Sequence, residues 1–367
     1  MIDIKKPVVL GVVASLALGI FAAVPTAHAD PVSDSYVAVG SDTLDASMNA
    51  LTNGTLATGA AVRITAGSSN LASYDAFGSA TISTTSGGPY FTRPSGSGAG
   101  VTALMASIQG TSYGSPAVNI AGQVDIARSS SGPGTNASAT GKLIYVPYAR
   151  DAVAYAYYPD PAHLGDLDNL TTAQLKSLYQ TGTQVIGSTT VTPLIPQATS
   201  GTRKFFLSAI GVSTDATCGM STCTTSTLPE NDATVLTPGT VIPFSSANWI
   251  AQANLVAQNT IPGTGVVKLG APDSIAPFTG TAPSLVPAPA FYTSAFGRDT
   301  YLVVEYARID TTSSTYDAVL AGLVTSTSTG ALTNFTSTLP SQPGSVKKKF
   351  GFLAPSTTTP QRAYATL

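Results

Sequence analysis

The stretch from Ile195 to Ile210 reads IPQATSGTRKFFLSAI, and it decides how we interpret the rest of the chain. An apolar pair and a proline lead into a polar turn at 199–202. Phe206 and Ile210 then lie four residues apart, which places them on one face of a helix. We therefore expect a strand end, a tight turn and a helix. The first amides of such a helix lack internal partners and can bind an anion, whereas the simpler alternative is an ordinary Ser or Thr N-cap.

The composition is that of a folded, weakly charged protein. The chain has 367 residues, of which 43% are hydrophobic and 10% are charged, and its formal net charge is −2. This length suffices for two domains with cores of their own. The charge balance gives no indication of a nucleic-acid partner. Few charges with many hydroxyl groups fit an extracellular protein.

Residues 1–29 have the pattern of a secretory signal peptide. Lys5 and Lys6 form a positive start, residues 8–24 are mostly apolar, and Ala27-His28-Ala29 fits an A-x-A cleavage site. We expect cleavage near Ala29 and a secreted protein, extracellular or periplasmic, with no membrane span afterwards. An uncleaved anchor is the alternative, and the shortness of the apolar run disfavours it.

The chain offers little material for metal or cofactor chemistry. Cys218 and Cys223 are the only cysteines, and in an exported protein we expect them to form one small disulfide. A metal site would need more ligands, and His163 is the only histidine after the signal peptide. His163 lies in a Pro- and Asp-rich connector, where a solvated role is simpler than a catalytic one. We expect no metal, no cofactor and no enzyme.

Strands and helices alternate along the chain, which predicts an α/β architecture with a parallel sheet. We expect strands at 36–39, 61–65, 123–127, 143–157, 190–195 and 296–308. We expect helices at 44–51, 98–108, 171–179, 247–258 and 316–323, the third of them with a capping box of Thr171 and Gln174. Residues 66–94 suggest a hairpin excursion or a flap. Lys347–Lys349 suggests a solvated turn before a terminal extended piece at 350–355.

Two long extended stretches, near 145–157 and 300–308, bracket the middle of the chain. Two lobes joined by two crossings would produce this pattern. The first lobe would take residues 30–150 plus 302–367, and the second would take 151–301. A ligand would then bind in the cleft between the lobes, against helix N-termini.

The order of several short motifs resembles one known family, the phosphate-binding solute receptors of ABC importers, which have the type II periplasmic-binding-protein fold. The motifs that carry this resemblance are Gly40-Ser-Asp-Thr43, Ser95-Gly-Ser-Gly98, Val124-Asp-Ile-Ala-Arg-Ser-Ser130, Tyr145-Val-Pro-Tyr-Ala-Arg-Asp-Ala-Val153, Leu170-Thr-Thr-Ala-Gln-Leu175, Ser200-Gly-Thr202 and Phe350-Gly-Phe-Leu-Ala-Pro355. They cover most of the chain after the signal peptide.

The resemblance implies a dehydrated oxyanion, phosphate or a relative, held by hydroxyl groups and helix amides. By position, the residues that would contact it are Thr43, Ser97 (with Ser95 as a possible substitute), Ser200, Gly201 and Thr202. Three Ser/Gly helix starts can together replace the water around an anion. The resemblance also implies an ABC permease as partner, and we expect a monomer.

Two positions depart from the family pattern. Pro196 stands where the family usually has an arginine, and Ser130 stands where it usually has the aspartate that accepts the proton of hydrogen phosphate. Selectivity for phosphate over other oxyanions is therefore open. Arg128 and Arg203 could supply the missing positive charge, or could be surface arginines.

We hypothesise a secreted solute-binding protein for phosphate or a related oxyanion, most simply serving ABC-type uptake. The alternative is a secreted surface or interaction protein that keeps the fold without transport. The two missing family charges and the absence of a Cys at the cleavage site favour that alternative. A phosphoester hydrolase on the same fold would lack a metal cluster and a base.

Overall fold

The computed structural model describes residues 30–31, 35–54, 70–212, 226–263, 265–325 and 327–364. Three predictions lie outside these residues: the signal peptide at 1–29, the strand at 61–65 and the disulfide between Cys218 and Cys223. Among the helices described, none has both the length and the apolar character needed to cross a membrane.

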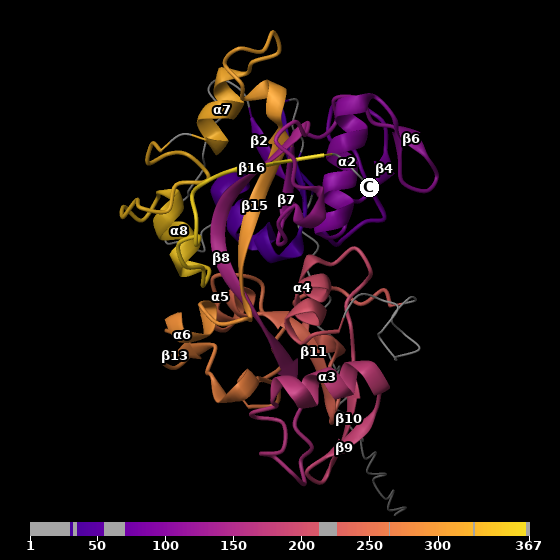
Figure 1. The fold of residues 1–367 in the computed structure, drawn as a ribbon, viewed down its shortest axis with the longest axis vertical. Coiled ribbons are helices and arrows are strands. Elements are labelled where there is room, and N and C mark those ends of the chain that lie inside the picture. Colours follow the sequence, from indigo (N-terminus) through magenta and orange to yellow (C-terminus); the bar gives the residue numbers. More distant parts are fainter. Residues whose placement is uncertain are drawn as a thin grey trace, which may run out of the picture.

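A ten-stranded mixed sheet runs through the length of the molecule (Figure 1). The strand order is β2-β1-β7-β15-β8-β11-β10-β9, and β12 and β16 also pair with β8. The strands are β1 (Tyr36–Gly40), β2 (Leu71–Ser73), β7 (Ile126–Ser129), β8 (Leu143–Tyr157), β9 (Gln184–Ile186), β10 (Thr189–Pro193), β11 (Thr240–Ser245), β12 (Lys268–Leu269), β15 (Gly297–Glu305) and β16 (Gln361–Ala363). Three small hairpins are formed by β3 (Thr81–Ile82) with β4 (Phe91–Thr92), β5 (Ser112–Tyr113) with β6 (Val118–Asn119), and β13 (Phe278–Thr279) with β14 (Val286–Pro287).

The prediction of a parallel sheet is only partly right. Strand β1 is parallel to β2 and β7, and β10 is parallel to β11. Strands β8 and β15 are antiparallel to each other, β15 is antiparallel to β7, and β8 is antiparallel to β11. The reason is the connection that these two strands make, because β8 carries the chain from the upper part of Figure 1 to the lower part and β15 carries it back.

The two crossing strands produce the two-lobed arrangement that the sequence suggests. Strand β8 has the predicted bounds, whereas β15 ends at Glu305 and is followed by a 3₁₀ turn, η8 (Tyr306–Arg308). Their register places Arg298 opposite Asp151 and Asp299 opposite Arg150. The lobe boundaries at residues 150 and 302 stay a prediction.

Eight α-helices are found in the described residues, with short 3₁₀ and π turns between the larger elements. The helices are α1 (Asp45–Asn49), α2 (Ser97–Gln109), α3 (Thr172–Thr181), α4 (Gly201–Ala209), α5 (Ser246–Ala253), α6 (Pro289–Tyr292), α7 (Ala318–Val324) and α8 (Pro343–Lys349). The short turns are η1 (Asp42–Leu44), η2 (Ala50–Gly54), η4 (Gly134–Asn136), η6 (Ala233–Val235), η7 (Pro272–Ser274) and η8. The predicted capping box of Thr171 and Gln174 is confirmed at the start of α3.

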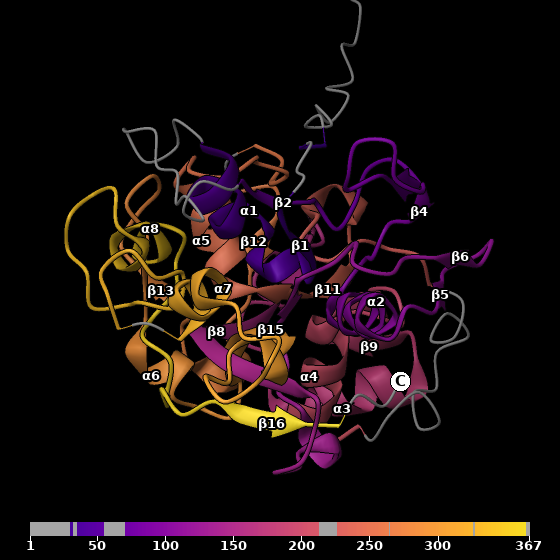
Figure 2. The ribbon, with the colours of Figure 1, turned by 90° about the horizontal axis from the view of Figure 1, so that it is seen from above.

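Alternating side chains of the upper sheet enter two different cores. Ile144, Val146 and Leu302 point to one core, which also contains residues of α1, α7 and α8. Tyr145 and Val303 point to the opposite core, which contains residues of α2. Figure 2 accordingly shows α7 and α8 on one side of β15 and α2 on the other. The lower sheet repeats this scheme, with α3, α4 and α6 in one core and α5 in the other.

One local prediction is wrong. Lys347 is fully buried, and its Nζ donates to the carbonyls of Tyr148 and Leu332, both at 2.8 Å. Burial lowers the pKa of Lys347 well below its ordinary value. The basic run ends the short helix α8, whose Val346 enters the core, so it is not a solvated turn. A helix of seven residues is too short for its period to be detected in the sequence.

Candidate functional site

The stretch that opens the sequence analysis folds as expected. Strand β10 ends at Pro193, and α4 begins at Gly201 with Ser200 as its N-cap. The Ser200 hydroxyl accepts a hydrogen bond from the Arg203 amide at 2.9 Å. Phe206 lies in the core of the lower half, and Gly201 at the helix start lies against Ser97 of the upper half. Ser200 is therefore an N-cap, as in the simpler alternative, and the predicted strand end, turn and helix are all present.

The start of α2 and the end of β7 contact this helix start. The hydroxyls of Ser97 and Ser130 lie 3.1 Å apart, and the Ser130 amide donates to the Ser97 Oγ at 3.0 Å. Both hydroxyls press on Gly201, where a methyl group would overlap them. Across the same contact, the Thr199 hydroxyl donates to the Ser95 carbonyl at 2.6 Å. The predicted helix starts therefore meet at one place.

A second group of polar side chains lies at the same helix start. The Thr43 and Thr202 hydroxyl oxygens are 3.2 Å apart. Both receive a hydrogen bond from Arg298 Nη2, at 3.0 and 2.9 Å. Thr202 donates to Glu230 Oε2 at 2.7 Å, and Thr43 reaches the same oxygen at 3.4 Å. All four side chains are buried. We call Thr43, Thr202, Glu230 and Arg298 the central cluster.

Arg298 is held in place by the two crossing strands. Its Nε and Nη2 donate to Asp151 Oδ2 at 3.1 and 2.8 Å, which follows from their opposite positions on β15 and β8. The other oxygen of Asp151 accepts from the Ser245 hydroxyl at 2.9 Å and from the Ala247 amide at 3.1 Å. The guanidinium also lies 5.6 Å from the ring of Phe205 on α4. Its direction towards the central cluster is thus fixed from several sides.

Three buried polar atoms in this region have no hydrogen-bond partner among the described residues. They are Arg298 Nη1, Glu230 Oε1 and Ser41 Oγ. Buried polar groups without partners are costly and point to strain or to a function. Next to them, burial and the Glu230 carboxylate raise the pKa of Asp42 to about 8, while a 2.7 Å hydrogen bond from Asn231 acts in the opposite direction. Asp42 therefore holds its proton more tightly than an ordinary aspartate does.

Of the eight predicted ligand residues, two have side chains directed elsewhere. Arg128 forms an ion pair with Asp45 and donates to Ser73 and to the Tyr74 carbonyl. Arg203 donates from Nη1 to the Pro196 carbonyl at 3.0 Å. Both arginines are buried, so neither is the surface arginine of the alternative interpretation. The remaining six, Thr43, Ser97, Ser130, Ser200, Gly201 and Thr202, lie at the contact between the two halves.

The sequence analysis missed Arg298, Glu230 and Asp151. A signal for two of them was present: each crossing strand carries an Arg-Asp dipeptide, Arg150-Asp151 and Arg298-Asp299. An antiparallel pairing of these strands lets each arginine face the aspartate of the other, and the structure has both ion pairs. Glu230 lies in a loop before η6 and gives no periodic signal.

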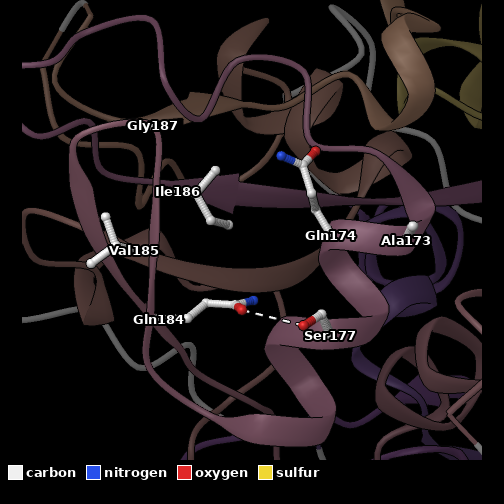
Figure 3. A pocket seen from close by; sticks show the side chains of 7 residues that line it. All are labelled: Ala173, Gln174, Ser177, Gln184, Val185, Ile186 and Gly187. Carbon is white, nitrogen blue, oxygen red and sulfur yellow. Dashed lines mark hydrogen bonds between the residues drawn. The ribbon is translucent and has the colours of Figure 1, made fainter.

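The structure has no grouping of His, Cys, Asp and Glu suited to a metal ion within its described residues. A hollow of about 380 Å³ lies on the surface between α3 and the hairpin of β9 and β10 (Figure 3). Two of its lining residues, Ser177 and Gln184, are joined by a 3.2 Å hydrogen bond. The hollow contains none of the predicted ligand residues.

Comparisons with known proteins agree with this architecture. A family model described as the PBP superfamily domain matches residues 25–321. No curated protein matches the chain. Among solved structures, an ABC-type phosphate transport receptor from Vibrio cholerae is 16% identical with a TM-score of 0.51, over 88% of this chain and 100% of that one. A phosphate-binding protein from Stenotrophomonas maltophilia is 13% identical with a TM-score of 0.47, over 88% and 91%.

The solved structures are too distant in sequence to transfer a ligand, and the likeness to the Vibrio cholerae receptor shows the fold alone. The family model, in contrast, covers well over half of the sequence, including both crossing strands up to residue 321. The chain therefore belongs to the PBP superfamily.

Proposed function

We propose that the protein is a secreted solute-binding protein that holds phosphate or a related oxyanion between its two halves. The observation that carries this proposal is the convergence of Thr43 from the upper half, Thr202 from the start of α4, and Arg298 from the crossing strand on one buried point. Hydroxyl groups, helix amides and a guanidinium are the donors that oxyanions require.

Arg298 supplies the positive charge that the sequence left unassigned. Its Nη1 is buried and has no acceptor among the described residues, so it is available to an oxyanion placed beside Thr43 and Thr202. This arrangement takes the place of the family arginine for which the chain has Pro196. The Vibrio cholerae protein of the same fold is described as a phosphate transport receptor, so phosphate is the first oxyanion to test.

The remaining parts of the proposal follow from this role. A solute receptor of this fold delivers its ligand to an ABC permease, so we propose such a permease as partner and a monomer as the working form. We expect no catalytic turnover, because a solute receptor releases its ligand unchanged, and His163 is partly exposed and contacts Asp160. Family membership favours solute binding over a surface protein without a ligand.

Isothermal titration calorimetry with phosphate, sulfate and sugar phosphates tests the proposal. We expect saturable heat for at least one oxyanion, and a loss of that heat in the Arg298→Met variant. Circular dichroism should confirm that the variant is folded. Titrations without heat for every oxyanion, in the native chain and in the variants described below, would refute the proposal.

A further inference from the structure

We propose that the carboxylate of Glu230 occupies the position of the solute's oxyanion and holds the two halves together when no solute is bound. A solute must then displace Glu230 before it can bind. This inference deepens the proposed function and rests on it for the identity of the competing ligand.

The hydrogen bonds of the central cluster identify Glu230 as the acceptor. A threonine hydroxyl has one proton to donate and two lone pairs that accept. Arg298 Nη2 can only donate, and it shares its two protons among Asp151, Thr43 and Thr202, so both hydroxyls are acceptors towards it. The Thr202 proton is then directed to Glu230 Oε2 at 2.7 Å, and the Thr43 hydroxyl lies 3.4 Å from the same oxygen. A carboxylate thus receives the donors that the resemblance assigns to phosphate.

The position of Glu230 is also favourable for an anion. Its acceptor Oε2 contacts the second residue of α4, where the positive end of the helix dipole attracts negative charge. The side chain is only 2% exposed, although glutamate is rarely buried without a partner of opposite charge. Its second oxygen, Oε1, has no partner in the described part of the chain. These are the properties of a group that substitutes for a ligand.

The charges around Glu230 favour displacement of its carboxylate by the solute over binding of both anions together. Arg298 already shares its charge with Asp151, at 2.8 Å. Asp42 lies near enough to Glu230 for the Glu230 charge to contribute to its raised pKa, and Arg128 acts on Asp42 in the opposite sense. A second anion beside Glu230 would therefore meet the Glu230 carboxylate and a guanidinium that is already paired with Asp151. Like charges in a buried site repel strongly.

The loop that carries Glu230 binds both halves of the molecule. The neighbouring Asn231 donates from Nδ2 to Asp42 Oδ2 in the upper half at 2.7 Å. Its Oδ1 accepts from the Ser245 amide at the end of β11 at 2.9 Å. The loop is therefore positioned by Asn231, and the Glu230 side chain adds the contacts of this loop to Thr43 and Thr202.

The experiment compares the native protein with Glu230→Gln and Glu230→Ala, with Glu305→Gln as the matched control. Glu305 lies at the far end of β15 and is not in the central cluster. Each protein is titrated calorimetrically with inorganic phosphate and sulfate. Small-angle X-ray scattering without added anion measures the radius of gyration, which reports whether the two halves separate.

We expect both Glu230 variants to bind phosphate about tenfold or more tightly than the native protein, because a competing closed state reduces apparent affinity by the fraction it occupies. Glu230→Ala should also have a larger radius of gyration without anion, and Glu305→Gln should match the native protein in both measurements. Tighter binding by the native protein would overturn the inference, since Glu230 would then accept a proton from the ligand.

Failure of the proposed function would give a different set of results from failure of the inference about Glu230. If no protein binds phosphate or sulfate but Glu230→Ala still expands, Glu230 holds the halves together and the choice of ligand is wrong. If the Glu230 variants neither expand nor bind more tightly, the inference is wrong, whatever the native protein binds. Thermal unfolding of each variant confirms that it is folded before either result is used.

Discussion

Two buried arginines on neighbouring strands have opposite roles. Arg128 on β7 is surrounded by partners of its own half: Asp45, Ser73 and the Tyr74 carbonyl. Arg298 on β15 has one carboxylate partner, Asp151, and directs the rest of its guanidinium at hydroxyls from two different halves. One arginine completes a core, and the other faces a place where the halves meet.

Burial of a charge therefore does not by itself identify a binding site. Arg128 is as buried as Arg298, and its place two residues before a family position made it one of two candidates for the missing positive charge, with Arg203 as the other. The two arginines differ in one atom. Arg298 Nη1 is a buried donor without an acceptor among the described residues, and no donor of Arg128 is in that position. Variants of the two arginines test this difference.

The largest effects should come from removing each arginine. Arg128→Met and Arg298→Met each leave a buried carboxylate without its partner, which typically costs about 3–5 kcal/mol of unfolding free energy. Urea denaturation measures this loss. Only Arg298→Met should abolish oxyanion binding in calorimetry, while a folded Arg128→Met protein should still bind. Loss of binding in a folded Arg128→Met variant would contradict the different roles of the two arginines.

The closeness of the two halves at α4 should be sensitive to a single methyl group. Gly201→Ala places a carbon against the Ser97 and Ser130 hydroxyls, and such overpacking costs about 1–3 kcal/mol. We expect a lower melting temperature and a larger radius of gyration. The control is Gly322→Ala in the exposed part of α7, where a methyl group meets no atom within 4 Å.

The control variant should behave in the opposite way. Gly322→Ala is expected to stabilise the helix by about 0.5–1 kcal/mol, because alanine loses less backbone entropy on folding. If Gly201→Ala were equally stabilising, the contact between α4, Ser97 and Ser130 could not be as tight as the structure has it. Calorimetric unfolding of both proteins distinguishes these outcomes.

The hydroxyls shared by Arg298 should contribute a smaller amount each. Thr43→Val and Thr202→Val retain the shape of the side chain and remove one donor, so each should weaken oxyanion binding by about 1–3 kcal/mol. Thr192→Val on β10, whose hydroxyl contacts Thr183 at 3.1 Å, should leave binding unchanged. Equal losses in all three variants would mean that the effect is one of folding.

The smallest expected effect is a change in the pH dependence of stability. Asp42 has a pKa of about 8 in the folded protein and of 3.8 as a free side chain, because burial and Glu230 disfavour its charged form. Folding therefore takes up a proton between these values, so this contribution is complete below about pH 4 and is lost as the pH rises towards 8. Asp42 is half-buried, and solvent screening keeps the effect modest.

Asp42→Asn should remove this dependence. Melting temperatures measured between about pH 5 and 8.5 should fall less steeply for the variant than for the native protein. Glu230→Gln should reduce the slope in the same direction, because it removes the neighbouring charge. A slope that is identical in all three proteins would show that Asp42 does not hold its proton in the folded state.

Much of the fold follows from local patterns. The long extended stretch of β8 has its predicted bounds, and the capping box of α3 is present as expected. Strand β11 and the edge strand β2 were missed because short buried strands have no period that distinguishes them from other apolar segments. The prediction of parallel strands was wrong for β8 and β15, which are antiparallel. Pairing between strands that are distant in sequence produces no local sequence pattern.

The candidate site likewise combines residues that local patterns predict with residues that only long-range contacts bring together. The helix starts could be predicted from the sequence: Ser200 before Gly201, and small residues around Ser97, because N-caps and close backbone approach impose residue types locally. The charged residues that join them could not be predicted. Arg298 and Glu230 are far apart in the chain, and each reaches Thr43 and Thr202 through long-range packing of strands and loops that no sequence period encodes.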